Sequence, residues 1–443
     1  MVREVNDIAL RAIDKVLDLA QHQGAEAEVF YLEQAQTPIE FEANRLKSLQ
    51  TKAEAGLALR LIHQGRLGFA SSTDLERPES LVEAALQTAS IGDPAALTFA
   101  GVLPELPPEV DSFEPPTTQA LVTKGQELIA QLRIYNPDLL VSADFTVNTS
   151  TRAVATSNGA FYQQSAQTVA ASLGANWVRG EDLLNIYSYS ATRSEEPDYQ
   201  ALLTEIQTKL TWATSTATVS GGTLPVIFTP RAVASVFGGL LRTIFSGQSV
   251  VQKSSPLADK VGEHLFDPRL TVYEDPTQGV GRRRVDDEGT ATQTKALIEN
   301  GVVKGFYWDR TWAQRAGCAP TGNGLRGGLG RPTPRLVNLC ITPGDATFAQ
   351  MVNSLKEGII VDQVLGAGQS NQLAGEFSVN LDLGYKVEHG EIVGRVKNTM
   401  VAGNLFIAGQ ALEVIGSEPE WVFGASRVPP LLFRQLGVAS RDR

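Results

Sequence analysis

The stretch PVIFTPRAVASVFGGLLRTIF, residues 225–245, determines how the second half of the chain is interpreted. Its first five residues form a short apolar run, which predicts a buried strand, and Pro230 suits the first turn of a helix. Helical spacing then predicts a helix over 231–245 with an apolar face made by Ala232, Val233, Val236, Leu240, Leu241 and Ile244. No histidine or glutamate occurs between Val226 and Gly262.

The residues before this stretch alternate between helical and strand patterns. We expect helices at 5–21, 79–91 and 198–214, and strands at 27–33, 37–41, 55–62 and 66–70. Hairpin turns are expected at His63-Gln64-Gly65 and Ser157-Asn158-Gly159. A proline-rich stretch at 103–116 reads as an extended connector. The pattern predicts an α+β domain at 1–220 that mixes helices with an antiparallel sheet.

The residues after the stretch are rich in strand patterns. Hairpins are expected at Asn300-Gly301 and His389-Gly390, and one helix at 347–355 interrupts the strands. We therefore expect the C-terminal domain, residues 221–443, to be a strand-rich, barrel-like body.

Composition argues against nucleic acid and membranes as partners. The formal net charge is −11 and the pI about 5.1, so phosphates and lipid headgroups are repelled overall. A basic cluster at Arg282, Arg283 and Arg284 is expected to be a solvated loop, because three acidic residues follow it. No apolar run approaches the length of a membrane span, and the two cysteines form no CxxC pair. The expected location is the cytoplasm.

Common catalytic motifs are absent from the sequence. It has no G-x-S-x-G elbow and no P-loop. The glycine-rich run 321–332 is expected to be a tight or mobile loop rather than a phosphate cradle, because prolines follow it instead of a helix. The histidines are too scattered for H-E-x-x-H, and His264 is the best single ligand candidate: His22, His63, His264 and His389. The acidic triplet Asp286-Asp287-Glu288 could bind a cation or a peptide amine, or be a charged turn.

Several stretches resemble the TldD/PmbA family, whose members are known as modulators of DNA gyrase and are also linked to peptide maturation. The most specific are DDEGTATQTKALIENGVVKGFYWDRTWAQRAG at 286–317, ITPGDATFAQMV at 341–352 and GEFSVNLDLGYKVEHGEIVGRVKNTMVAGNLF at 375–406. The stretch 246–276 and TGNG at 321–324 match in order and spacing. The resemblance covers most of the chain.

The resemblance implies which arm of the family this chain belongs to. TldD-type members resemble zinc peptidases and carry H-E-x-x-x-H on the helix that corresponds to 231–245, which has neither residue here. The chain therefore resembles the PmbA (TldE) arm, with no metal ligand and no catalytic residue of its own. The resemblance implies a heterodimer with a TldD-type subunit that holds zinc, and a peptide substrate in an internal groove; a homodimer stays open.

Five residues are candidates for the peptide groove or the subunit interface: Asp286, Asp287, Glu288, Asn300 and Asn323. The alternative is that they are ordinary turn residues. Three functions remain open: a non-catalytic subunit of a TldD-type metallopeptidase acting on unfolded or precursor peptides, a stand-alone metallopeptidase with non-standard ligands, or a peptide- or protein-binding module such as a gyrase-modulator-type regulator.

Overall fold

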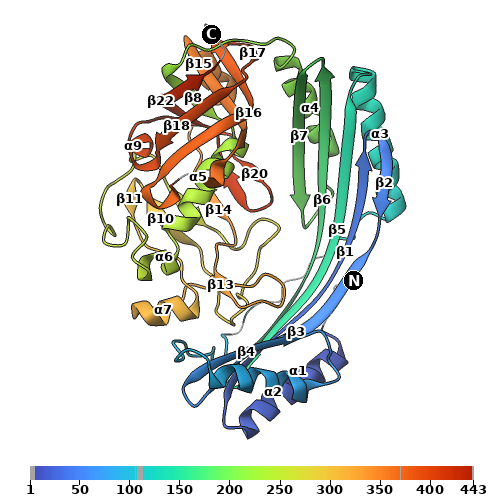
Figure 1. The fold of residues 1–443 in the computed structure, drawn as a ribbon, viewed down its shortest axis with the longest axis vertical. Coiled ribbons are helices and arrows are strands. Elements are labelled where there is room, and N and C mark those ends of the chain that lie inside the picture. The colour runs from blue at the N-terminus through green and yellow to red at the C-terminus, as the bar shows by residue number, and fades with distance from the viewer. Residues whose placement is uncertain (1–4, 105, 107–112, 370, 442–443) are drawn as a thin grey trace.

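A long antiparallel sheet forms the first half of the computed structural model, which describes residues 5–104, 106, 113–369 and 371–441. The sheet order is β4-β3-β1-β5-β6-β7, and β2 pairs with β1. The strands are β1 Glu26–Glu42, β2 Arg45–Leu49, β3 Lys52–His63, β4 Arg66–Ser72, β5 Leu140–Thr156, β6 Phe161–Arg179 and β7 Asp182–Thr192. Figure 1 shows β5 to β7 standing beside the C-terminal half of the chain.

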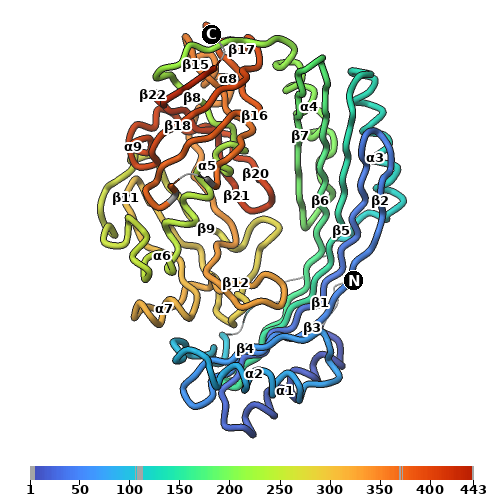
Figure 2. The backbone as a smooth tube through the Cα atoms, viewed as in Figure 1, coloured from blue at the N-terminus to red at the C-terminus, as the bar shows by residue number. Residues whose placement is uncertain are grey.

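Four helices pack on this sheet. Helices α1 (Asp7–His22) and α2 (Pro78–Ser90) cover one end, where their apolar faces join a core with β1 and β3. Helices α3 (Thr118–Tyr135) and α4 (Tyr199–Trp212) join a second core with β5, β6 and β7. Figure 2 shows these two pairs of helices at different ends of the sheet, with α1 and α2 below and α3 and α4 alongside the upper part of the strands.

One strand expectation is wrong. The segments 27–33 and 37–41 are not two strands but parts of β1, which runs unbroken for 17 residues. Pro38 has no N–H for a ladder, and it lies where β1 changes partner on one side, from β3 at Gln36 to β2 at Ile39. The other side stays paired with β5 throughout, which holds the strand together.

The C-terminal body contains a closed barrel. Strands β15-β8-β22-β18-β16 follow one another, and an additional β15–β16 pairing closes the ring. Their bounds are β8 Gly222–Phe228, β15 Glu357–Leu365, β16 Glu376–Glu388, β18 Thr399–Asn404 and β22 Leu431–Ser440, with β17 Glu391–Arg395 and β19 Leu412–Ile415 attached. The expected α+β class, with a barrel-like second half, is confirmed.

A second sheet in the body has the order β11-β10-β9-β14-β21-β20. It comprises β9 Val272–Glu274, β10 Lys295–Glu299, β11 Val302–Val303, β14 Leu339–Ile341, β20 Glu420–Val422 and β21 Ser426–Val428, while β12 Gly324–Leu325 pairs with β13 Thr333–Pro334. The helices are α5 Pro230–Ile244, α6 Gly247–Val251, α7 Arg310–Ala316, α8 Phe348–Asn353 and α9 Leu405–Gln410, with short 3-10 turns at Ala367–Gln369 and Gln372–Ala374.

The structure tests two further expectations only over the residues that it describes. The connector at 103–116 cannot be followed throughout, because residues 105 and 107–112 lie outside the described part of the chain. Within that described part, no helix combines the length and apolar character needed to cross a bilayer.

Candidate functional site

Helix α5 begins and packs as its sequence predicts. Thr229 caps it by accepting the N–H of Ala232, and Pro230 occupies the first turn. Most of its middle is buried, with Ser235 and Gly239 partly exposed, and the Phe237 ring lies 5.0 Å from Phe228 and 5.3 Å from both Phe377 and Phe433, centroid to centroid. The central turns of α5 therefore pack their large apolar side chains into the core.

The charged side chains of α5 lie near its two ends. Arg231 packs its guanidinium 4.3 Å from the Tyr187 ring centroid and donates to Gln363 at 3.1 Å and Glu205 at 3.1 Å. Arg242 donates to the carbonyl of Ala425 at 2.8 Å and to Ser426 at 2.9 Å. Both arginines thus connect α5 to neighbouring segments through hydrogen bonds.

The residues present do not fit a zinc ion on α5. The histidines lie in separate elements: His22 ends α1, His63 ends β3, His264 is exposed and bridged to Val302, and His389 sits in the β16–β17 turn. Over residues 5–104, 106, 113–369 and 371–441, no three His, Cys, Asp or Glu side chains are grouped so that they could hold a metal.

A buried group of charges joins the sheet to the body; we call it the junction cluster. It consists of Glu28 on β1, Arg60 on β3, and Glu288 and Arg326 in the body. Arg60 lies 2.6 Å from Glu28 and 2.8 Å from Glu288, and Arg326 reaches Glu28 at 2.5 Å. Burial opposes the charge of Glu28, but Arg60 and Arg326 hold its pKa below the ordinary value. The alternating signs compensate the cost of burying four charges.

The acidic triplet lies at this junction and is buried. Asp286 accepts from the main-chain N–H groups of Glu288, Thr290 and Gly324 at 3.0, 2.8 and 2.9 Å. Burial, reinforced by Glu288, nevertheless raises the pKa of Asp286 to about 8. At Asp309, the cap of α7, burial and again Glu288 raise the pKa to about 7.

Asp287 behaves in the opposite way. It accepts from the N–H of Arg326 at 2.7 Å and from the Arg283 guanidinium at 3.1 Å. Burial opposes its ionisation, but Arg283 and Arg152 hold its pKa below the ordinary value. The expectation of a solvated loop at 282–284 is wrong, because all three arginines are half-buried and Arg283 pairs with Asp287.

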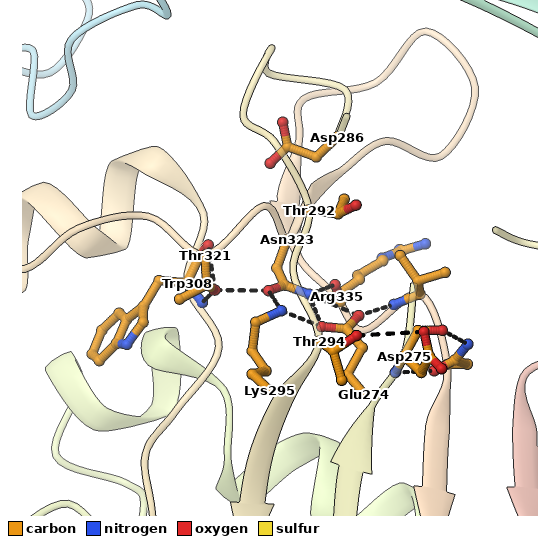
Figure 3. Close-up of polar contacts among 12 residues, drawn as sticks. Glu274, Asp275, Asp286, Thr292, Thr294, Lys295, Trp308, Thr321, Asn323 and Arg335 are labelled. Atoms are coloured by element: carbon orange, nitrogen blue, oxygen red, sulfur yellow. Dashed lines mark hydrogen bonds and ion pairs between the residues drawn. The ribbon is translucent and has the colours of Figure 1, made fainter. Parts of the chain in front are cut away.

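Asn323 lies in a neighbouring buried network, and Asn300 does not. Figure 3 shows Asn323 between Lys295, Glu274 and Thr321. Its amide donates to Glu274 at 2.9 Å and accepts from Lys295 at 3.0 Å and Thr321 at 2.7 Å. Asn300 instead occupies the exposed β10–β11 turn with a φ of 50°. Four of the five candidates therefore lie in buried polar networks of the body, and Asn300 lies apart.

Two pockets lie between the sheet and the body. The basic pocket, of about 380 Å³, is lined by one face of β1, β5 and β6 and by the loop 280–283. The aromatic pocket, of about 480 Å³, lies between β7, α4, the start of α5 and β20. The aromatic residues that line it are Tyr189, Trp212, Phe348, Trp421 and Phe423.

Charged groups make up one wall of the aromatic pocket. Lys209 lies 2.9 Å from Asp362 and 2.5 Å from Glu205, which also receives Arg231. Glu420 is exposed by surface area, yet partial desolvation of its carboxylate, reinforced by Glu205, raises its pKa to about 7. An apolar pocket with a few placed charges is a common form of ligand site.

The outer edge of β7 runs along the contact between the sheet and the body where the two pockets lie, a region we call the cleft. Side chains of the body cap its main chain at Leu183, Asn185 and Tyr187: Arg395 donates to the first carbonyl, Gln363 to the second, and Arg231 to the third. In an antiparallel strand, the N–H and C=O groups of every second residue point to the same edge. The main-chain groups of Tyr189 and Ala191 therefore point to the same outer edge as those of Leu183, Asn185 and Tyr187. In the described chain, no hydrogen bond caps the edge at these two positions.

Sequence reasoning missed the residues that line the cleft. Arg152, Lys209 and Asp362 were not candidates, because each becomes notable only through partners far along the chain. Glu28 and Arg60 carried a usable signal: each is the one charge within a short apolar run, 27–32 and 57–62, and the signs are opposite. In the sheet they are direct cross-strand neighbours.

Comparison with known proteins agrees with this architecture. Residues 27–90 match the family model "PmbA/TldA metallopeptidase domain 1", and residues 221–440 match "PmbA/TldA metallopeptidase C-terminal domain". The metalloprotease PmbA of Escherichia coli O157:H7 is 25 % identical over 92 % of this chain and 91 % of its own.

Two solved structures share the fold over almost the whole chain. TldE from Thermococcus kodakarensis is 26 % identical and superposes with a TM-score of 0.90 over 97 % of this chain and 100 % of its own. A Thermotoga maritima protein described as a candidate DNA gyrase modulator has a TM-score of 0.88 at 21 % identity over the same shares, which shows the fold alone. With two domain models and full-length relatives matched, the chain belongs to the PmbA/TldD family of metallopeptidase-like proteins.

Proposed function

We propose that this chain is the non-catalytic, PmbA/TldE-like subunit of a TldD-type metallopeptidase system that acts on unfolded or precursor peptides. The observation that carries the proposal is helix α5. Where a TldD-type helix presents two histidines and a glutamate, α5 offers buried apolar side chains and two glycines. A zinc peptidase needs about three protein ligands around an open position, and α5 supplies none.

The partner subunit would hold zinc and activate water, while this chain contributes binding surface. The cleft supports that role because it combines an uncapped strand edge with two pockets. An extended peptide can add to the edge of β7 at Tyr189 and Ala191 through main-chain hydrogen bonds, which tolerate many sequences. The aromatic pocket lies beside Tyr189 and suits an apolar side chain of that peptide.

A cytoplasmic location is part of the proposal. Both cysteines are unpaired: Cys318 is exposed and Cys340 is buried. Burial, helped by Asp275, raises the pKa of Cys340 to about 11, so its thiol is not a nucleophile near neutral pH. Free thiols without a disulfide suit a reducing compartment.

Reconstitution with a TldD-type protein tests the proposal. Each purified subunit and their mixture would be assayed on an unfolded peptide, with zinc content measured in every sample. We expect this chain alone to hold no stoichiometric zinc and to cleave nothing, and the mixture to co-purify and to cleave in a chelator-sensitive way.

Two outcomes would contradict the proposal. Stoichiometric zinc and chelator-sensitive cleavage by this chain alone would make it a stand-alone metallopeptidase. Failure to bind a TldD-type protein, together with unchanged cleavage by that protein, would leave a binding module outside proteolysis.

A further inference from the structure

We propose that the aromatic pocket holds a basic side chain, lysine or arginine, of the peptide that lies along β7, with Glu420 as the carboxylate that faces its charge. That the ligand is a peptide rests on the proposed function, whereas the chemistry of the pocket does not. The pocket has a volume of about 480 Å³, which is in the size range of ligand sites. It lies beside Tyr189, on the strand edge with which a peptide would pair.

Aromatic rings from both halves of the molecule line the pocket. Tyr189 of β7 packs against Phe423, which follows β20, at 6.0 Å between ring centroids, and Figure 1 shows β20 beside β7. Trp212 of α4 stacks against Phe348 of α8 at 6.1 Å. Phe423 is 46 % exposed and holds a φ of 51°, which a bulky residue adopts only where its surroundings fix it. Such rings favour the methylene stem of a basic side chain, and their negative faces attract its cationic head.

Four of the charged groups in the pocket wall compensate one another. Lys209 lies between Glu205 and Asp362, and Arg231 also reaches Glu205. Two carboxylates and two cations therefore make a neutral group that ties together side chains of α4, α5 and β15. Both cations are already engaged by these carboxylates, so the case for a ligand cation depends on the other acidic residues of the pocket.

Three further carboxylates line the pocket, and they differ in their partners. Asp198 caps α4 by accepting the N–H of Ala201 at 2.9 Å, and Glu418 accepts the N–H of Phe348 at 2.9 Å. Within the described part of the chain, no hydrogen bond or ion pair reaches the carboxylate of Glu420, which solvent contacts. Glu420 is therefore the carboxylate that a ligand cation can approach as its first partner.

The electrostatics at Glu420 favour a cation. Partial desolvation and the negative charge of Glu205 raise its pKa to about 7. The effect of Glu205 exceeds the opposing effect of Lys209, and the effect of Asp362 exceeds that of Arg231. Negative charge thus outweighs positive charge at this carboxylate. A bound ammonium or guanidinium would compensate the excess and favour the ionised form of Glu420.

Pairing with β7 would bring one peptide side chain to the pocket. A residue directly opposite Tyr189 has its Cβ about 5 Å from that of Tyr189. Its side chain would therefore leave the strand edge beside the aromatic rings. A long basic side chain can lay its apolar stem on these rings and place its charge at Glu420, whereas an acidic side chain would be repelled there. The inference thus adds a charged head to the apolar contact that the proposed function gives this pocket.

Binding of matched peptides to the full chain tests the inference. One unstructured fluorescent peptide, acetylated and amidated so that its ends are neutral, would carry lysine, arginine, norleucine or glutamate at a single position. Norleucine is the decisive comparison, because it keeps the stem of lysine without the ammonium. We expect the lysine and arginine peptides to bind about tenfold more tightly than the norleucine peptide, and the glutamate peptide to bind most weakly.

Substitutions then identify the carboxylate. Glu420→Gln should remove most of the preference for lysine over norleucine, and Glu420→Asp should keep part of it. Glu413→Gln is the matched control, because Glu413 pairs with Arg434 on the exposed surface of the body, and it should leave the preference intact. Equal affinity for the lysine and norleucine peptides would overturn the inference, as would a preference that survives undiminished in a folded Glu420→Gln protein.

A pH profile separates a charge contact from a structural role. Between about pH 6 and about pH 8, Glu420 changes from mostly protonated to mostly ionised, while lysine keeps its charge. The preference for lysine over norleucine should therefore rise across this range, and it should stay flat in Glu420→Gln. No histidine lines the pocket, and the charged groups that face Glu420 are Glu205, Lys209, Asp362 and Arg231. The same rise in both proteins would contradict the inference.

The two proposals can fail separately. Cleavage of the lysine and norleucine peptides by the reconstituted mixture, without any difference in affinity, would leave the proposed function standing and remove the basic-residue subsite. A lysine preference that depends on Glu420, without any cleavage by the mixture, would support the subsite and contradict the metallopeptidase role.

Discussion

Helix α5 and the junction cluster are two buried regions of opposite composition. The middle of α5 packs apolar side chains into the core of the body, whereas the junction cluster places two carboxylates and two guanidinium groups between the sheet and the body. Apolar burial is non-directional, but paired charges need one geometry. We infer that α5 stabilises the body, and that the junction cluster fixes how the sheet docks onto it.

The largest expected effect tests the junction. Arg60→Met leaves Glu28 paired only with Arg326 and leaves Glu288 without its ion-pair partner. We therefore expect the unfolding free energy to fall by about 3–5 kcal/mol. Denaturant unfolding would measure it. Arg434→Met, which breaks an exposed pair, should leave the midpoint unchanged. Equal effects of the two variants would show that the junction charges do not fix the docking.

The next effect tests α5. Leu240 is 1 % exposed, so Leu240→Ala should cost about 2–5 kcal/mol through lost burial and the cavity left behind. The matched control is Ile134→Ala on α3, where an exposed side chain should change stability by less than about 0.5 kcal/mol. If Leu240→Ala kept full stability but abolished cleavage by the reconstituted mixture, α5 would have a catalytic role that its composition does not indicate.

The third effect separates the two regions by pH, because Asp309 interacts electrostatically with Glu288 of the junction cluster, whereas α5 contains no acidic residue. Burial and Glu288 raise the pKa of Asp309 from 3.8 to about 7, so the folded chain binds this proton more tightly than the unfolded chain does. Its contribution to stability is full below the unfolded pKa and is lost as the pH rises toward about 7, by at most about 1.4 kcal/mol per pH unit.

Asp309→Asn should remove that slope while keeping the cap of α7, since asparagine caps as well as aspartate. Unfolding free energies measured across this pH range on both proteins would check it. The same slope in both proteins would mean that Asp309 is ionised throughout and that Asp286 or another group titrates instead.

The smallest effect concerns the candidate that lies apart. Asn300 has a φ of 50°, a region that glycine adopts without strain, and it lies in an exposed turn. Asn300→Gly should therefore change the unfolding free energy by less than about 0.5 kcal/mol and leave peptide binding unchanged. A clear loss of peptide or partner binding would return Asn300 to the site.

Local signals were sufficient for much of the fold. The turns at Gln64-Gly65, Asn300-Gly301 and His389-Gly390 adopt the positive φ angles that such pairs tolerate, and each joins two antiparallel strands as expected. The continuity of β1 could not be predicted, because it depends on pairing with β5, more than a hundred residues later. Long-range pairing outweighed the local break at Pro38.

The site was predictable only in part, for a related reason. The sequence identified Asp286, Asp287 and Glu288 as unusual but could not show that they are buried. Their burial depends on Arg60 and Arg326, which reach them from two distant segments, as well as on the neighbouring Arg283. Charges that are close in space but distant in sequence leave no periodic pattern.

The spacing of one ion pair has a consequence for biosynthesis. Glu28 and Arg326 are 298 positions apart, so at ribosomal speeds Arg326 appears roughly 15–60 s after Glu28. During that interval the newly made N-terminal half carries the Glu28–Arg60 pair on an open sheet face, where only water can complete its hydrogen bonds. A ribosome that stalls before codon 326 would leave this half without its cover and open to chaperone capture or aggregation.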